Sequence, residues 1–290
     1  MIISGFTIIK NAVLNDYPIL EAIRSILPVV DEMIVLVGDS TDGTLALIES
    51  LNEEKIKIHH SVWDMKPANG DNVLAVETNK ALQLIHPKSD WAFYIQGDEN
   101  IHEKFHETIL EACKKYKDDL NIEGLLFKYL HFYGTYDYVG DSRRWYSHEV
   151  RIIRNDTSIK AYRDAQGFRK NGEKLQVKLI EATVYHYGWV KSPASMQQKI
   201  KNVAKILLPE DRAEEILKGS DIFDFSMFDS LKKFTGTHPV VMQNRVKANN
   251  LLVELDIQKK QFSFKEKMLY RLEKMTGKRL FEFKNYRILK

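Results

Sequence analysis

The 290-residue sequence has a single cysteine, few prolines and no long uncharged hydrophobic run. One cysteine cannot form a disulfide within the chain. Cys113 recurs in helical register with Phe105, Ile109 and Tyr116, which predicts a place in the core and a reducing compartment. The start of the chain has no basic segment or small-residue cleavage site, and no run reaches membrane-spanning length. We therefore expect a cytoplasmic protein.

Two common nucleotide-binding motifs are also missing. The chain contains no GxGxxG fingerprint and no GxxxxGK[ST] loop. Their absence argues against dinucleotide redox chemistry and against P-loop hydrolysis. There is no internal repeat and no low-complexity segment, so the alternation of strands and helices has to indicate the fold.

Charge is distributed unevenly, although the formal net charge is only +3. Residues 259–290 hold 11 Lys and Arg against 3 Asp and Glu. The aromatic residues interleaved with them are Phe262, Phe264, Tyr270, Phe281, Phe283 and Tyr286. Such a tail could make peripheral contact with an anionic membrane, and the simpler interpretation is a solvated helix pair packed on the domain. Nucleic acid is not an expected partner, because no recognition motif accompanies the basic residues.

The first hundred residues alternate between strand-like and helix-like segments. Apolar and β-branched runs predict strands at 4–10, 33–37, 55–60 and 91–96. Helical periodicity predicts helices at 18–27, 44–51 and 72–85, the last one after a loop with Pro67 and Gly70. This order implies an α/β fold with a mainly parallel sheet flanked by helices on both faces. Ligands of such sheets bind beyond the carboxyl ends of the strands, here at 10–15, 38–43 and 97–100.

The second half of the chain predicts a mixed extension of the same sheet. Strand-like segments occur at 124–131, 149–153 and 182–187, and helices are expected at 192–208 and 210–218. We predict a catalytic domain at 1–208, with a nucleotide-binding half at 1–100 and an acceptor-side half at 101–208. A basic, helical C-terminal extension is expected to follow at 209–290.

Two adjacent acidic residues, Asp98 and Glu99, follow the strand predicted at 91–96. Adjacent carboxylates repel each other, so a site that keeps both ionised usually holds a cation or hydrogen-bond donors. A hard divalent cation bound through carboxylates and substrate phosphates fits this description. Alternatively, Asp98 caps the next turn and Glu99 faces water. The residues of this segment do not decide between the two.

The order of four segments resembles the start of a family 2 glycosyltransferase with the GT-A fold. The segments are SGFTIIKNA, GDSTDGTLALI, NGDNVLAVETNKAL and DWAFYIQGDE. The resemblance implies an inverting enzyme that moves a sugar from a nucleotide-sugar donor. In that family the fourth strand ends in a DxD motif whose last Asp binds the metal. Here the motif is Gln96-Gly97-Asp98, so Gln96 replaces the first Asp.

The resemblance also implies a set of donor-binding residues. Asp39 stands one or two places after the family's uracil-binding Asp, and Thr78-Asn79 stands where Arg-Asn is common. The residues expected to bind the nucleotide-sugar, for which UDP-sugar is the favoured class, are Lys10, Asn11, Asp39, Ser40, Asp42, Asn79, Gln96 and Lys191.

His186 ends a strand among aromatic residues in YHYGWVKSP. A lone histidine in such a place is more often packed and hydrogen-bonded than a ligand. The resemblance favours a ligand, because many GT-A enzymes complete the metal shell with a late histidine and neutralise the diphosphate with a nearby Lys or Arg. This predicts Asp98 and His186 as ligands of Mn²⁺ or Mg²⁺, with Lys191 beside the diphosphate.

Inverting transfer also needs a carboxylate that takes the proton of the acceptor hydroxyl. Asp164, in AYRDAQGF, is our first candidate and Glu149 is the second. Other acidic residues of the same region are Asp141, Asp156, Glu173 and Glu181. Aromatic and basic side chains at 133–138 and 143–146 could stack on a sugar or pair with an anionic acceptor.

The expected activity is transfer of a sugar to a glycan or lipid-linked acceptor, in a setting such as surface polysaccharide assembly at the inner face of the membrane. A protein of the same fold that binds a nucleotide or glycan without catalysis is one alternative. A sugar-phosphate nucleotidyltransferase is another, although KNAVLND follows the first strand where that class has a Gly-rich phosphate loop.

Overall fold

The structure is a computed structural model of the full chain. It describes residues 1–65, 72–249, 251, 253 and 255–290. The loop expected around Pro67 and Gly70 lies outside the described residues.

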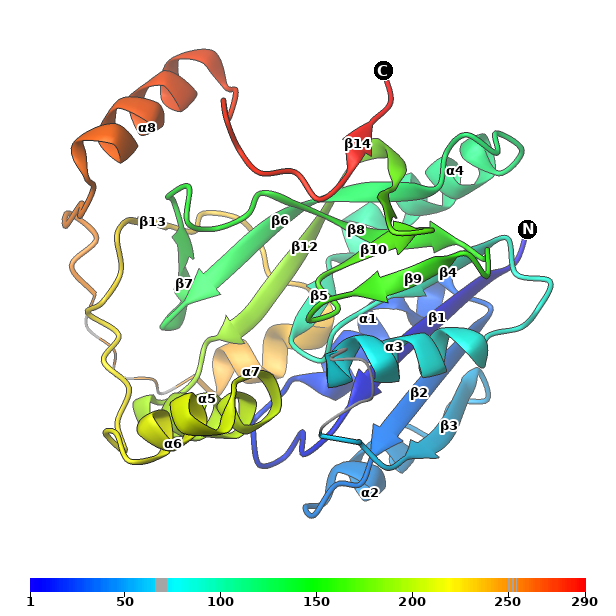
Figure 1. The fold of residues 1–290 in the computed structure, drawn as a ribbon, viewed down its shortest axis with the longest axis horizontal. Helices are drawn as coiled ribbons and strands as arrows, with labels where there is room; N and C mark the ends of the chain where they lie inside the picture. The colour runs from blue at the N-terminus through cyan, green and yellow to red at the C-terminus, as the bar shows by residue number, and fades with distance from the viewer. Residues whose placement is uncertain (66–71, 250, 252, 254) are drawn as a thin grey trace.

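The first half of the chain forms a parallel sheet with helices on both faces, as predicted (Figure 1). Its strands are β1 (Ile3–Ile9), β2 (Glu32–Gly38), β3 (Ile56–Ser61) and β4 (Trp91–Tyr94). Its helices are α1 (Ile19–Ile26), α2 (Thr44–Glu49) and α3 (Val73–Gln83). The strands pair in the order β3-β2-β1-β4, and every pairing is parallel. The α/β fold class is therefore confirmed for this half.

Alternating side chains of the central strands build a core on each face of the sheet. All seven residues of β1 and of β2 are buried. Phe6 and Ile8 pack toward α3, whereas Ile3 and Ile9 pack toward α1. Successive residues of a strand point to opposite faces, so an uninterrupted apolar run is needed where both faces are covered.

The second half extends the same sheet with mixed pairing. The added strands are β5 (Glu99–Ile101), β6 (Gly124–Tyr133), β7 (Thr135–Gly140), β8 (His148–Arg154), β12 (Gln176–Trp189), β13 (Leu231–Lys233) and β14 (Arg287–Ile288). β8 lies antiparallel between β4 and β6, and β12 runs parallel to β6. The prediction of a mixed extension is confirmed.

A short strand, β5, connects the first half of the chain to the second, and the sequence did not predict it. β5 pairs antiparallel with β12, in a register that places His186 opposite Glu99. The prediction ended the preceding strand at Gln96 and took 97–100 as a loop. Three residues are too few to show a period of two, so no pattern in the sequence predicts this strand.

Smaller elements surround the main sheet. A separate sheet consists of β9 (Ile159–Tyr162), β10 (Gly167–Lys170) and β11 (Glu173–Lys174). The remaining α-helices are α4 (His106–Tyr116), α5 (Pro193–Leu207), α6 (Glu210–Leu217), α7 (Gln243–Lys247) and α8 (Phe264–Thr276). Short 3₁₀ turns lie at Leu27–Val29, Glu103–Phe105 and Val240–Met242. Cys113 of α4 is fully buried against the sheet, as its spacing predicted.

The C-terminal segment after residue 208 is less purely helical than predicted. β13 pairs with β7, and β14 pairs with β12, so the segment joins the main sheet at two places. Between them, α8 stands away from the sheet (Figure 1). A capping box between Ser263 and Glu266 starts α8, and Gly277 ends it in the left-handed region at φ 67°. Within the described part of the chain, no helix combines the length and apolar character needed to span a bilayer.

Candidate functional site

A cleft of about 550 Å³ opens at the carboxyl ends of β1 and β4. Helix α5 closes its other side through Met196, Ile200 and Val203. This is the edge of the sheet at which the strand order predicted a ligand site. Of the residues singled out from the sequence, the cleft is lined by Lys10, Gln96, Asp98, Asp164 and His186.

Asp98 is the most strongly held acidic group of the cleft. Its Oδ2 lies 3.0 Å from the Lys199 ammonium and 3.6 Å from Nε2 of His186. Burial would raise the pKa of Asp98, but the charges of Lys199 and His186 hold that pKa well below its usual range. A side chain at Gly188 would come within 2.5 Å of Oδ2, so glycine is required for this close approach. Asp98 is thus an ionised carboxylate facing the cleft.

His186 is oriented by a second histidine. Nε2 of His131 lies 3.0 Å from the carbonyl oxygen of Tyr146, which can only accept, so Nε2 of His131 carries the hydrogen. Burial and the neighbouring His186 hold the pKa of His131 well below 6.5, which leaves its Nδ1 as an acceptor. That atom lies 3.2 Å from Nδ1 of His186, which then donates. Nε2 of His186 is left facing Asp98.

The pair Asp98 and His186 fits a divalent ion only when other ligands complete the shell. Within the described residues, no group of three His, Cys, Asp or Glu side chains could hold a metal. An imidazole nitrogen and a carboxylate oxygen 3.6 Å apart can be ligands of one ion, because each ligand bond is about 2.0–2.2 Å. Diphosphate oxygens and water commonly fill the remaining positions around Mg²⁺. An ion here would share Asp98 with Lys199.

Lys199 is a site residue that the sequence analysis missed. Its ammonium donates to the Gly188 carbonyl oxygen at 2.9 Å and lies 4.9 Å from the ring centre of Tyr17, in addition to pairing with Asp98. The signal was present in the helical pattern, because Lys199 falls on the same face of α5 as Met196 and Ile200. A lysine within an apolar stripe is unusual unless it meets a buried carboxylate.

Lys10 lines the same cleft from the carboxyl end of β1. Its ammonium lies 2.7 Å from Oδ1 of Asp39 and 5.7 Å from the ring centre of Trp63. The same Asp39 oxygen accepts from the backbone N–H of Trp63 at 3.0 Å. The buried indole N–H of Trp63 has no hydrogen-bond partner within the described part of the chain. That N–H packs against Gly38, so the feature that Trp63 offers a ligand is its aromatic plane, which suits a planar group such as a nucleotide base.

Asn11, Ser40 and Asp42 join two loops next to Lys10 and do not line the cleft themselves. The N–H of Asn11 donates to Oγ of Ser40 at 3.0 Å, and the Asn11 side chain accepts from Thr41 N–H at 2.9 Å. Asp42 accepts from the N–H groups of Leu14 and Thr44, at 2.7 and 3.0 Å. Thr44 is the first residue of α2, so Asp42 accepts from the first amide of that helix.

Asn79 and Lys191 also lie outside the cleft lining. The Asn79 side chain accepts from the Ala161 N–H at 2.7 Å and so ties α3 to β9. Lys191 is 1% exposed, and its ammonium donates to the carbonyl oxygen of Asp16. Burial, followed by the nearby charge of Lys199, lowers the pKa of Lys191 to about 7. In this arrangement Lys199 is the lysine placed to meet a ligand.

Asp164 lies where the cleft meets a second cavity of about 330 Å³. It is exposed on the turn between β9 and β10, between Arg163 at φ 55° and Ala165 at φ 59°. Two non-glycine residues in the left-handed region cost about 1 kcal/mol each, and such strain is common where a turn presents a functional group.

Glu149, the second candidate for the base, lines the second cavity and not the cleft. It is 4% exposed, and its Oε2 has no hydrogen-bond partner within the described residues. Burial raises the pKa of Glu149 to about 8, against the opposing charge of Arg151. Glu149 therefore has a perturbed acidity but no direct access to the cleft.

Glu99, the second acidic residue after β4, is a structural group. Nε of the buried Arg151 donates to its Oε2 at 2.8 Å, and the Tyr129 hydroxyl donates to its Oε1. Both side chains of the ion pair are fully buried. Of the two cases expected for a pair of adjacent carboxylates, a shared cation or nearby donors, Glu99 has the donors Arg151 and Tyr129. The alternative in which Glu99 faces water is wrong, because β5 turns its side chain into the sheet.

No protein-family profile matches the chain, and no curated protein matches it. Among solved structures it is similar to S. aureus TarS 1-349 in complex with UDP-GlcNAc, at 17% identity and a TM-score of 0.41, over 75% of this chain and 70% of that one. It is also similar to glucosyl-3-phosphoglycerate synthase from Mycobacterium tuberculosis in complex with Mn²⁺, UDP and phosphoglyceric acid, at 14% identity and a TM-score of 0.41, over 72% and 80%.

Against a longer TarS structure, the match covers 75% of this chain but only 42% of that one, at 16% identity and a TM-score of 0.40. At this level of similarity, what the cleft does has to be inferred from its own residues.

Proposed function

We propose that the chain is a glycosyltransferase that takes a nucleoside-diphosphate sugar into the cleft and transfers the sugar to an acceptor hydroxyl. One observation carries the proposal: Asp98, His186 and Lys199 meet at the carboxyl end of β4, in a cleft large enough for a nucleotide-sugar. A carboxylate, an imidazole and an ammonium together suit a diphosphate and a cation bound to it. Lys10 and Trp63 line the same cleft side by side, and we propose that the base binds next to them.

Asp98 and His186 are the residues that would hold Mn²⁺ or Mg²⁺. When bound, the ion would act as a Lewis acid that offsets charge on the departing nucleoside diphosphate. Lys199 and Lys10 line the same cleft as donors that Asp98 and Asp39 already hold in place, so little reorganisation is needed when they meet a diphosphate. UDP-sugar is the donor class that we propose, because Asp39 stands near the uracil-binding position implied by the family resemblance.

Asp164 is our proposed base. The acceptor hydroxyl loses its proton to the Asp164 carboxylate, and its oxygen forms a bond to the anomeric carbon. The bond between that carbon and the phosphate oxygen breaks on the opposite face, and its electron pair leaves with the nucleoside diphosphate. Configuration at the anomeric carbon is inverted. Asp164 suits this role better than Glu149, because Asp164 lines the cleft, is exposed and reaches the second cavity as well.

The proposal includes peripheral contact with an anionic membrane through the tail. Phe264, Met268 and Met275 of α8 are exposed and face a common groove, and Phe281 is 92% exposed. Lys267 and Arg271 line the same groove. Exposed apolar side chains flanked by basic ones bind the surface of anionic bilayers. This placement fits a lipid-linked or glycan acceptor made at the inner face of the membrane during polysaccharide assembly.

The test is a thermal-shift panel of UDP-, GDP- and dTDP-sugars with and without Mn²⁺, followed by an assay for diphosphate release. A glycosyltransferase is stabilised by one donor class and releases the diphosphate slowly even to water. Stabilisation without release would favour the non-catalytic binder, which the replacement of the first DxD carboxylate by Gln96 keeps as the alternative. Absence of stabilisation by every donor would overturn the proposal.

A further inference from the structure

The second cavity is enclosed by three separate parts of the chain. Its walls come from the β7–β8 segment 143–149, the β9–β10 turn 162–169 and the C-terminal segment 282–286. Its most frequent lining residue is arginine, represented by Arg143, Arg144, Arg163 and Arg169. The cavity shares Asp164 with the donor cleft, so the two spaces meet at the proposed base.

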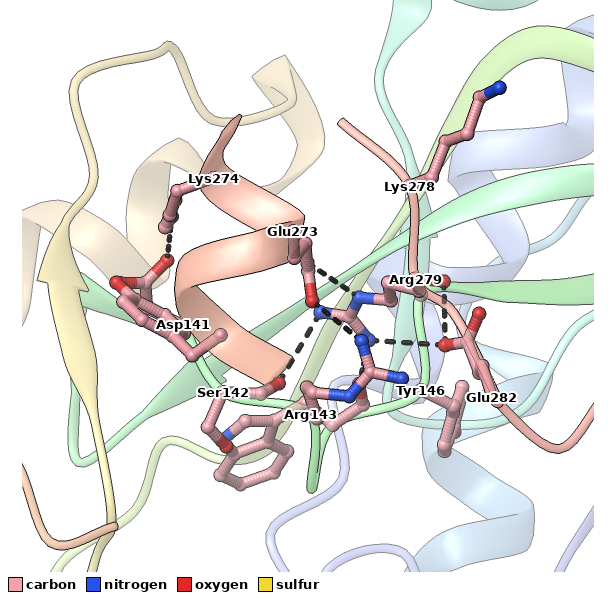
Figure 2. Close-up of polar contacts among 12 residues, drawn as sticks. Asp141, Ser142, Arg143, Tyr146, Glu273, Lys274, Lys278, Arg279 and Glu282 are labelled. Carbon is pink, nitrogen blue, oxygen red and sulfur yellow. Dashed lines mark hydrogen bonds and ion pairs between the residues drawn. The ribbon is translucent and has the colours of Figure 1, made fainter. Parts of the chain in front are cut away.

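The C-terminal wall is fixed by a network of ion pairs (Figure 2). Arg279 contacts Glu273 at 2.8 Å and Glu282 at 3.2 Å, and it donates to the Trp145 carbonyl oxygen at 2.7 Å. Arg143 contacts the same Glu273 at 3.2 Å and donates to the Leu280 carbonyl oxygen. The wall is therefore bound to the β7–β8 segment before any ligand arrives.

The ion-pair network neutralises two of the charged side chains that line the cavity, and three arginines of the lining stay outside it. Arg143 and Glu282 are paired with Glu273 and Arg279. Among the described residues, no carboxylate lies within ion-pair distance of Arg144, Arg163 or Arg169.

Arg169 is buried and donates to the carbonyl oxygen of Asn285 at 2.7 Å. Its guanidinium lies 4.7 Å from the ring centre of Tyr162, and that of Arg163 lies 5.1 Å from the same ring. The guanidinium groups of Arg163 and Arg169 thus lie beside one aromatic ring, and neither forms an ion pair with a carboxylate of the described residues.

Glu149 does not cancel this positive charge. Its Oε2 is buried in the cavity without a hydrogen-bond partner, and burial raises its pKa to about 8. A neutral carboxyl is a hydrogen-bond donor as well as an acceptor, which suits a hydroxyl group of a ligand. The groups that face Glu149 include Arg151, Glu99 and Asp164, together with Tyr146, Arg169 and Tyr286.

We propose that this cavity is the acceptor site and that it selects an acceptor carrying a phosphate or carboxylate group on a polyol or sugar. The proposal rests on the transferase function proposed above. Arg144, Arg163 and Arg169 bind the anionic group, because guanidinium groups bind phosphate and carboxylate through paired hydrogen bonds. Glu149 binds a hydroxyl of the polyol. The hydroxyl that accepts the sugar then lies next to Asp164, at the opening into the donor cleft.

The test compares the binding of glycerol 1-phosphate, glycerate, glycerol and inorganic phosphate to the full chain by calorimetry. The variant is Arg144→Gln/Arg163→Gln, since both residues are exposed and their removal should leave the fold intact. The matched control is Arg24→Gln, an exposed arginine of α1 that lines neither space. Binding of UDP is measured on all three proteins as an independent report on the donor cleft.

We expect glycerol 1-phosphate and glycerate to bind the wild type more tightly than glycerol or inorganic phosphate. The dissociation constant should rise at least about tenfold in the double variant, the equivalent of losing one charged hydrogen bond, and stay unchanged in Arg24→Gln. UDP binding should be unchanged in both variants. Equal affinity of glycerol 1-phosphate for wild type and double variant would overturn the acceptor site, as would affinity for inorganic phosphate equal to that for the esters.

If the proposed transferase function is wrong, the binding results differ from those that would overturn the acceptor site. In that case UDP and the donor sugars do not bind to any of the proteins, whereas arginine-dependent binding of glycerol 1-phosphate is retained. The cavity would then be an anion site of a protein with another function.

Discussion

The Nε2 atom of His186 lies 3.6 Å from Oδ2 of Asp98, although the two residues come from different halves of the chain. The antiparallel pairing of β5 with β12 brings them together, and Lys199 of α5 approaches the same carboxylate oxygen at 3.0 Å. The donor cleft therefore depends on one acidic side chain with two basic neighbours.

Asp98→Asn should lower the rate of diphosphate release from a donor sugar by about a hundredfold or more, because it removes the charge that holds both Lys199 and a cation. The measurement is the release of nucleoside diphosphate at saturating donor with Mn²⁺. The matched control is Asp39→Asn, which changes an acid paired with Lys10 and should alter donor affinity more than the rate. A rate equal to that of the wild type would remove Asp98 from the proposed mechanism.

Lys199→Gln tests whether the lysine competes with a metal for Asp98. With the ammonium gone, Asp98 and His186 should bind Mn²⁺ more tightly, while donor binding without metal weakens. Manganese binding can be followed by electron paramagnetic resonance of the free ion. If the substitution leaves manganese affinity unchanged while donor binding falls, Lys199 rather than a metal would be the principal cation for the diphosphate.

The sequence predicted the parallel half of the sheet and the residue at its ligand edge for clear physical reasons. Strands such as β1 and β2 are buried on both faces, so their apolar runs are long enough to be recognised, and the end of β4 fixes the place of Asp98. The same reasoning could not find β5, β13 or β14, which have two or three residues each and depend on pairing partners distant in the sequence.

Charged side chains of the site were harder to predict than its backbone. Lys199 and Lys191 both follow β12, and only the packing of α5 against the cleft decides that Lys199 meets Asp98 while Lys191 turns to the Asp16 carbonyl oxygen. Glu99 was coupled to Asp98 because the two are adjacent in sequence. The buried Arg151 that binds it lies on β8, whose place beside β4 the sequence did not reveal.

Asp164→Asn should lower the rate of sugar transfer while leaving donor binding unchanged. We expect donor binding close to that of the wild type and a transfer rate lower by about 10² to 10⁴, the usual contribution of a general base. Glu149→Gln should lower the transfer rate far less, because Glu149 does not line the donor cleft. A larger loss of rate in Glu149→Gln than in Asp164→Asn, with both proteins folded, would reverse the assignment of the base.

The tail predicts a dependence on lipid charge. The full chain should sediment with vesicles containing phosphatidylglycerol and less with vesicles of phosphatidylcholine alone, and added salt should weaken the binding. Phe281→Ser and Phe264→Ser remove side chains that are 92% and 88% exposed, so they should reduce sedimentation without changing the melting temperature. The control is Val62→Ser, which changes an exposed apolar side chain that follows β3 and lies outside the tail. Equal sedimentation of all variants would exclude the tail as the contact.

Glu149 predicts a specific dependence of stability on pH. Its pKa is about 8 in the folded chain and near 4.5 in the unfolded chain, so between these values the folded state binds the extra proton. This contribution to stability is complete below pH 4.5 and is lost as pH rises through about 8. Ionised above that pH, the buried carboxylate faces the like charges of Glu99 and Asp164, and the charges of Arg151 and Arg169 offset its burial only in part.

Glu149→Gln removes this titration, so its melting temperature relative to that of the wild type should rise by several degrees between pH 5 and pH 8.5. Each pKa unit corresponds to about 1.4 kcal/mol, and the upper bound for the full shift is on the order of a few kcal/mol. The exposed Glu54→Gln is the matched control and should show no such trend. The measurement is the melting temperature of the three proteins across this pH range. If the difference in melting temperature between Glu149→Gln and wild type does not change with pH, Glu149 is already ionised at pH 5 and its pKa is not raised.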